Sequence, residues 1–391
     1  MNARGIALAA DSAVTLGDGR KIYLSAEKLF ELAPTVPVGI MTYGAADLMG
    51  VPWETIVAGY RKHLGDRRHD TLREYLDDFV TFIEGASAMF PDAVQQECFA
   101  SVSRDIWSEL YSRPWKKELR KHRQRNGRDA FEVLRRLIAE DHPKWEQHPL
   151  QESIDAGFPD MVIADYGGAL EKAERDVFGP DELPADIRES LNTTLRLFLS
   201  RADLSGSCGS GLVIAGMGEA EHFPSLLHCY AGPIVKGRLK LHIINHAQVT
   251  HRDAAMIIPF AQREIIDTII RGIHPELAEN LPTLLERSLK AHTRRNKGTE
   301  TDDYIPDVVK RFQDGVQKET FEKYSEPFMT AVSAMPRQEL ATIAEVLVSL
   351  TAFRAHASVD EAETVAGPVD VAILSKGDGF VWVKRKRFSV P

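Results

Sequence analysis

Short apolar runs typical of buried strands occur in three separate parts of the sequence, and helical patterns occupy the stretches between them. The strand patterns lie within residues 1–45, 212–244 and 369–385. Unbroken apolar runs such as Gly5–Ala10 favour strands that are buried on both faces. Strands that alternate with helical blocks in this order predict an α+β fold in which helices cover sheets.

The helical patterns fall into large blocks, at about residues 50–200 and 250–330. Within the first block, Leu72, Leu76 and Phe79 recur at three- and four-residue steps, which is the spacing of one face of an amphipathic helix. Both blocks are therefore predicted to be helical.

The last part of the chain is predicted to form a long helix followed by a β-hairpin. The helix covers about residues 337–356, and its apolar stripe consists of Leu340, Ile343, Ala344, Leu347 and Leu350. The tetrapeptide at 376–379, Lys-Gly-Asp-Gly, supplies a turn between strands at Val369–Leu374 and Phe380–Arg385.

The composition is that of a globular protein kept in a reducing compartment. Of the 391 residues, 43% are hydrophobic and 27% are charged, which excludes a disordered chain. No apolar run approaches the roughly 18 residues needed to cross a bilayer. A net charge of −9 excludes a global attraction to nucleic acid, and the scattered cysteines do not form a disulfide framework. We expect a cytoplasmic protein without a membrane segment.

Three other patterns could carry chemistry on their own. Cys208 lies in the stretch SGSCGSG, where a loop is favoured over a nucleophile because no base accompanies the thiol. His242, His246 and His251 lack the spacing of a metal site, and no metal is predicted. The segment 113–128 holds eight basic residues, one acid and a tryptophan. The acidic balance of the chain favours a solvated helix and loop there over contact with nucleic acid or an acidic partner.

The segments GIALAADSAVT (5–15), EKLFEL (27–32) and VGIMTYGAADLM (38–49) together resemble the proteasome β-subunit family of N-terminal-nucleophile (Ntn) hydrolases. In that family an acidic residue follows a buried strand, and a lysine precedes the next strand. A glycine opens the first helix after the strand that comes next. Residues 212–239 resemble the family's middle strands, and residues 364–380 resemble its closing turn and strands.

The resemblance implies a four-layer αββα sandwich in one domain over residues 1–391, with helical insertions at about 50–200 and 250–330. It implies a bacterial proteasome-like protein that forms a homo-oligomer and hydrolyses a peptide or protein substrate without a cofactor. The sequence has no phosphate-binding loop of an ATPase, so an ATPase that drives this protein would be a separate chain.

Residue by residue, the resemblance assigns roles around a catalytic centre. Lys28 matches the family's catalytic lysine, and Asp11 matches the acid that orients it. The lysine charge would lower the pKa of a neighbouring amine and stabilise developing negative charge. Thr15 and Met41 match positions whose backbone groups line the substrate and the oxyanion.

A further pair is predicted near the end of the chain. Thr364 is assigned to the support of the nucleophile, with Glu361 as its acidic companion. The alternative for this segment is a simple turn from a helix into a strand, because the family's serine and two glycines are replaced here by Thr364 and the sequence Val-Ala-Gly.

The family's nucleophile is an N-terminal threonine whose own α-amino group acts as base, since an α-amine has a pKa of about 8 against about 10.4 for lysine. Family spacing places this threonine about sixteen residues before Asp11, where the sequence offers only ten. We therefore expect a truncated start, and no hydrolysis by residues 1–391 alone. The alternative is a non-catalytic assembly or regulatory module with the same fold.

Overall fold

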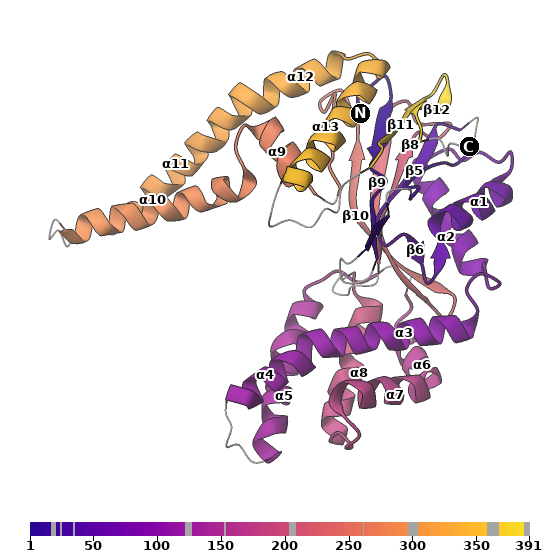
Figure 1. Cartoon of the computed structure of the whole chain (residues 1–391), viewed down its shortest axis with the longest axis vertical. Coiled ribbons are helices and arrows are strands. Elements are labelled where there is room, and N and C mark those ends of the chain that lie inside the picture. The colour runs from indigo at the N-terminus through magenta and orange to yellow at the C-terminus, as the bar shows by residue number, and fades with distance from the viewer. Residues whose placement is uncertain are drawn as a thin grey trace. The chain divides into compact units, whose positions relative to one another are not determined.

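The structure is a computed structural model and describes residues 1–16, 21–23, 26–33, 36–121, 127–151, 154–202, 209–260, 262–295, 304–357 and 367–386. It is a mixed α+β protein with antiparallel strand pairs (Figure 1). The chain divides into two compact units. Unit 1 comprises Met1–Met41, Ala215–Ser225 and Ala247–Pro391, and unit 2 comprises Thr42–Ile214 and Leu226–His246.

The strands are β1 Ile6–Ala10, β2 Val14–Leu16, β3 Lys21–Tyr23, β4 Leu29–Glu31, β5 Val38–Gly44, β6 Asp47–Leu48, β7 Val51–Pro52, β8 Ser210–Gly216, β9 Ser225–Val235, β10 Arg238–Gln248, β11 Asp370–Ser375 and β12 Gly379–Lys384. They form a three-stranded sheet of order β1-β11-β12 and a five-stranded sheet of order β10-β9-β8-β5-β4. The remaining strands form the pairs β2-β3 and β6-β7.

The α-helices are α1 Trp53–Leu64, α2 Leu72–Gly85, α3 Asp92–Trp107, α4 Arg113–Lys121, α5 Gly127–Glu146, α6 Phe158–Asp165, α7 Gly167–Phe178, α8 Ala185–Ser200, α9 Glu264–Arg271, α10 Pro275–Arg295, α11 Ile305–Thr320, α12 Glu326–Ala334 and α13 Arg337–Ala357. The π-helical turns η1 Ser108–Ser112 and η2 Phe321–Ser325 join α3 to α4 and α11 to α12. The predicted first strand, last helix and terminal hairpin are confirmed by β1, α13 and β11–β12.

In unit 1, α13 covers one face of the three-stranded sheet (Figure 1). β1 and β11 pair antiparallel, with Ala10 opposite Asp370. Ala7 and Ala9 of β1 pack with Ala341 of α13 in one apolar cluster. Small side chains on both elements allow the helix and the strand to approach closely, and this contact partly buries the face of β1 that faces α13.

The opposite face of this sheet packs on β5, and a glycine makes the approach possible. A Cβ atom at Gly39 would lie 2.9 Å from the ring of Phe380 and 3.3 Å from Leu374. β5 also pairs antiparallel with β4, where Leu29 lies opposite Met41. Unit 1 therefore contains a helix, a sheet and a second pair of strands in successive contact.

The apolar stripe predicted for α13 is partly wrong. Leu340 and Leu347 are buried as expected, but Leu350 is 40% exposed. The buried face continues instead through Thr351 and Ala355. Small residues lie where the helix packs on alanines of β1, whereas the side chain of the larger Leu350 is turned toward solvent.

Within the described residues, α13 is the one helix with the length and apolar composition to cross a membrane. Length and composition are weak evidence for a membrane span, since a helix packed on a sheet meets the same two criteria. α13 packs against β1 and β11.

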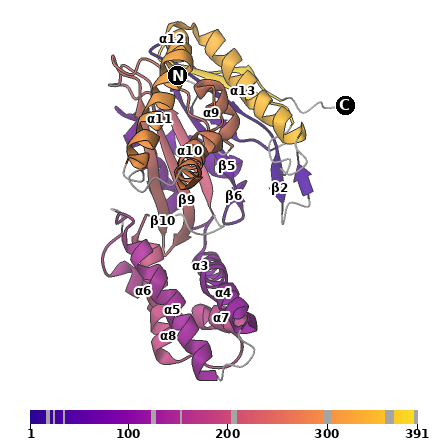
Figure 2. The ribbon, with the colours of Figure 1, turned by 90° about the vertical axis from the view of Figure 1, so that its left-hand side faces the viewer.

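α10 and α11 of unit 1 lie side by side in both views (Figures 1 and 2). Among the described residues of these helices, the buried side chains are Thr293 and Ile305. Leu277 and Leu284 of α10 are 48% and 47% exposed. This helical pair therefore holds little core of its own.

In unit 2, hydrogen bonds and close contacts join α1 and β5 to β8. The indole nitrogen of Trp53, the first residue of α1, donates to Ser210 Oγ of β8 at 2.9 Å. A Cβ atom at Gly211 would lie 2.0 Å from the ring of Tyr43, so the glycine makes room for this ring. Tyr43 Oη lies 2.6 Å from His228 Nε2 of β9.

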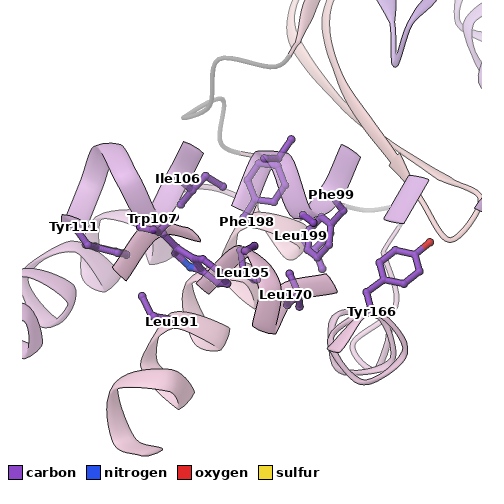
Figure 3. Close-up of a cluster of buried hydrophobic side chains, with 14 of the residues drawn as sticks. Phe99, Ile106, Trp107, Tyr111, Tyr166, Leu170, Leu191, Leu195, Phe198 and Leu199 are labelled. Carbon is purple, nitrogen blue, oxygen red and sulfur yellow. The ribbon is translucent and has the colours of Figure 1, made fainter. Parts of the chain in front are cut away.

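The helices α3 to α8 of unit 2 enclose a separate apolar core (Figures 2 and 3). Figure 3 shows Trp107 and Tyr111 together with leucines of α8, Leu191 and Leu195. These four side chains are 1% exposed or less. This core confirms that the described residues between α2 and β8 are mainly helical and shows that these helices pack together.

Candidate functional site

The structure brings Asp11 and Lys28 together in unit 1. Lys28 Nζ donates to Asp11 Oδ1 at 2.8 Å, and the two side chains are only 15% and 12% exposed. The second carboxylate oxygen of Asp11 accepts from the backbone N–H of Ala13 at 3.0 Å. Asp11 directly follows β1 and Lys28 directly precedes β4, so two strand ends determine where the pair lies.

A second ion pair lies beside the first and is more deeply buried. Lys386, just after β12, lies 3.1 Å from the carboxylate of Asp370, the first residue of β11. The side chains of Lys386 and Asp370 are 8% and 5% exposed. The backbone N–H of Lys386 also donates to Asp370 Oδ1 at 2.7 Å. A charge this deeply buried requires such pairing, because an unpaired ion away from water is costly.

Lys386 connects this buried pair to the segments that carry Asp11 and Lys28. Its ammonium donates to Ser12 Oγ at 3.0 Å and to the carbonyl oxygen of Ala26. The backbone N–H of Ala26 in turn donates to the carbonyl oxygen of Ser12 at 3.1 Å. The neighbours of Asp11 and Lys28 in the chain are therefore tied to each other and to the terminal strands.

Ser12 is not available as a nucleophile in this arrangement. Its side chain is fully buried, and its Oγ donates to the carbonyl oxygen of Pro368 at 2.8 Å. The adjacent ammonium of Lys386 is the donor in its own bond to Ser12, so it cannot take the hydroxyl proton. Ser12 holds the backbone together rather than offering a reactive group.

The other predicted site residues are placed as follows. Met41 lies within β5, which has β8 and β4 as neighbours, and its side chain is 8% exposed. The backbone of Thr15 lies in β2, opposite Ile22 of β3. Thr364 and Glu361 lie outside the described residues.

Sequence reasoning missed Ser12, Asp370 and Lys386. The available signal was the acid at the start of an otherwise apolar strand, in the sequence PVDVAILS. Its partner could not be identified because Lys386 reaches it through the register of β11 and β12, which the spacing of apolar residues does not determine.

The remaining candidates are dispersed. Cys208 lies outside the described residues. The ring of His251 packs edge-on against Phe223, and burial lowers the pKa of His242, with Lys240 adding to the effect. Within the described ranges, histidine, cysteine and carboxylate side chains do not gather in threes as a metal site requires.

Comparison with known proteins gives no independent support for an assignment. No protein-family model, no curated protein and no solved structure matches the chain.

Proposed function

We propose that this chain is the body of a proteasome-like Ntn hydrolase that cleaves peptide bonds in peptides or proteins. The ion pair between Asp11 and Lys28 is the observation that carries the proposal. The resemblance assigns these two residues to neighbouring catalytic roles, and their side chains lie 2.8 Å apart although seventeen positions separate them in the sequence.

The role proposed for the ion pair of Asp11 and Lys28 is electrostatic. A hydroxyl nucleophile with its own α-amine as base works best when that amine is neutral near pH 7. The ammonium of Lys28 would lower the pKa of such an amine and stabilise the negative charge that develops during attack. Asp11 would hold the ammonium in place. The nucleophile of the proposal is an N-terminal threonine, as the family resemblance implies.

The proposal includes the finer fold and the assembly. The contacts of α13, the three-stranded sheet and β5 in unit 1 support the layered αββα sandwich that the resemblance implies. A cytoplasmic homo-oligomer acting on a peptide or protein substrate follows from the same family expectation. Thr15, Met41, Thr364 and Glu361 keep the roles given by the resemblance as predictions.

The test is peptide hydrolysis by the natural gene product. Lys28→Ala is expected to lower kcat/KM for fluorogenic peptides by about 100-fold or more, since the residue acts on the reacting groups. The matched control is Lys384→Ala in the same unit, because Lys384 forms an exposed pair with Glu345 and should leave kcat/KM unchanged.

Two results would contradict the hydrolase. One is hydrolysis that Lys28→Ala leaves intact. The other is a natural protein that starts at Met1 or Asn2 and hydrolyses nothing, which would favour the non-catalytic assembly or regulatory module instead.

A further inference from the structure

A row of cations on α4 lines a hollow in unit 2. The hollow has a volume of about 450 Å³, and the described residues that line it are Arg113, Lys116, Lys117 and Arg120. Their spacing of three, four and seven residues places all four on one face of the helix. A volume of this size is within the range of pockets that hold small molecules.

The acids around α4 neutralise this face only in part. Arg113 pairs with Glu109, one turn earlier. The one acid within α4, Glu118, is engaged by Arg136 of α5 at 2.7 Å. Like charges four residues apart on a helix repel each other, and an anion that lies across the row would relieve this repulsion.

Two of the four cations are left for a ligand. Lys116 Nζ donates to the carbonyl oxygen of Val177 at 3.0 Å, which fixes it at the wall of the hollow. In the part of the chain that the structure describes, no carboxylate lies within salt-bridge distance of Lys117 or Arg120. Both side chains are exposed.

The opposite side of α4 anchors the row to a packed core. The ring of Trp115 stacks on Phe131 at 6.3 Å and lies 6.2 Å from Phe178. The cations are therefore presented by a helix with a fixed position, not by a loop. Because Trp115 is turned inward, it does not offer a surface for stacking a nucleic-acid base.

These observations select the chemical class of the ligand. Arg113 and Arg120 are seven residues apart, or about 10 Å along the helix axis, which one phosphate group cannot span. Arginine and lysine together suit phosphate oxygens, through paired N–H donors and a point charge. We propose that this face of α4 binds an oligophosphate, a linear anion with at least two linked phosphate groups.

The proposal is tested by titrating inorganic tripolyphosphate into the full chain, with EDTA present and at 0.15 M KCl, by calorimetry. Saturable binding is expected, at least about tenfold tighter than that of orthophosphate, because the row engages several phosphate groups at once. Lys117→Glu with Arg120→Glu should weaken it at least tenfold. The matched control reverses two exposed charges on α11, Lys310→Glu with Lys318→Glu, and should bind like the wild type.

Each other outcome overturns the proposal. Equal affinity for tripolyphosphate and orthophosphate would mean a general attraction to anions, as would an equal loss in the α11 control. Retention of single-stranded DNA that depends on Lys117 and Arg120 but that tripolyphosphate fails to displace would assign the face to nucleic acid. None of these measurements depends on peptide hydrolysis, so the result is independent of the proposed function.

Discussion

At the scale of single residues, the ion pairs beside the candidate site differ in burial from those on the surface. The side chains of Lys386 and Asp370 are less than a tenth exposed. Those of Lys384 and Glu345, nearby in unit 1, are 52% and 33% exposed. Removing one partner of a buried pair leaves a charge without solvent or counterion, whereas an exposed charge keeps its water.

We predict that Lys386→Met lowers the free energy of unfolding by about 3 kcal/mol or more, because it leaves the Asp370 carboxylate buried and unpaired. The double variant Lys386→Met with Asp370→Asn should lose less stability than Lys386→Met alone. The carboxylate charge is then absent, and the amide oxygen at position 370 still accepts from the backbone N–H of residue 386. Urea denaturation measures both. Lys384→Met is the control, with an expected loss below about 1 kcal/mol. Equal losses at positions 384 and 386 would contradict this account.

Glycine positions provide a second prediction at this scale. Gly216 has a φ of +152°, and a Cβ atom there would lie 2.1 Å from the carbonyl oxygen of Pro37. Gly216→Ala should therefore destabilise unit 1 by about 2 kcal/mol. Gly315→Ala in α11, where nothing lies within 4 Å, should stabilise by about 0.5–1 kcal/mol. Thermal unfolding of the two variants shows whether each change raises or lowers stability. Unchanged stability in Gly216→Ala would refute the close contact.

At the scale of elements, strand and helix positions follow from the sequence more closely than the faces they bury. The apolar run ending at Ala10 and the glycine turn of the last hairpin identify β1 and β11–β12 because each pattern is local. The predicted stripe of α13 is partly wrong, since Leu350 is apolar but 40% exposed, and the sequence does not show which face of the helix meets the sheet. The π-turns η1 and η2 add a residue to one helical turn, and no sequence period marks them.

The contact between α5 and α8 makes the stability of unit 2 depend on pH. His142 Nε2 lies 3.0 Å from Thr194 Oγ1, and burial lowers the pKa of His142, against a partial opposing effect of Asp141. The unfolded chain then binds the proton more readily than the folded chain. Stability should fall as the pH drops below the unfolded value of about 6.5, and the full loss is reached below the folded pKa.

The check is the free energy of unfolding between pH 7.5 and 5. His142→Gln should show a smaller loss over this range than the wild type. His246→Gln is the control, because the side chain of His246 is exposed. An identical pH dependence in wild type and His142→Gln would contradict the prediction.

The helices α10 and α11 should open more easily than those of the unit 2 core. Thr293 and Ile305 are their buried side chains among the residues described, whereas α3 buries Phe99, Ile106 and Trp107. Local opening is cheap where few apolar contacts are lost. Amide hydrogen exchange should be at least about tenfold faster in α10 and α11 than in α3. Equal protection would show that another surface covers these helices in solution.

At the scale of the whole molecule, the sequence predicts the α+β class and the pairing of Asp11 with Lys28, but not what surrounds that pair. The pair is expected from motifs that resemble those of the proteasome β-subunit family, at a similar spacing. The supporting network of Ser12, Asp370 and Lys386 depends on which strands become neighbours, a long-range property that apolar patterns leave open. The motifs of the resemblance do not cover the helical core of unit 2. The amphipathic patterns of its own helices account for that core.

Asp11 and Lys28 are proposed to serve an N-terminal nucleophile. The most direct measurement is the N-terminal residue and intact mass of the protein isolated from its own host. If the pair serves such a nucleophile, the mature chain is expected to begin with threonine. A mature chain that begins at Met1 or Asn2 would contradict it, because the ion pair would then have no nucleophile to support.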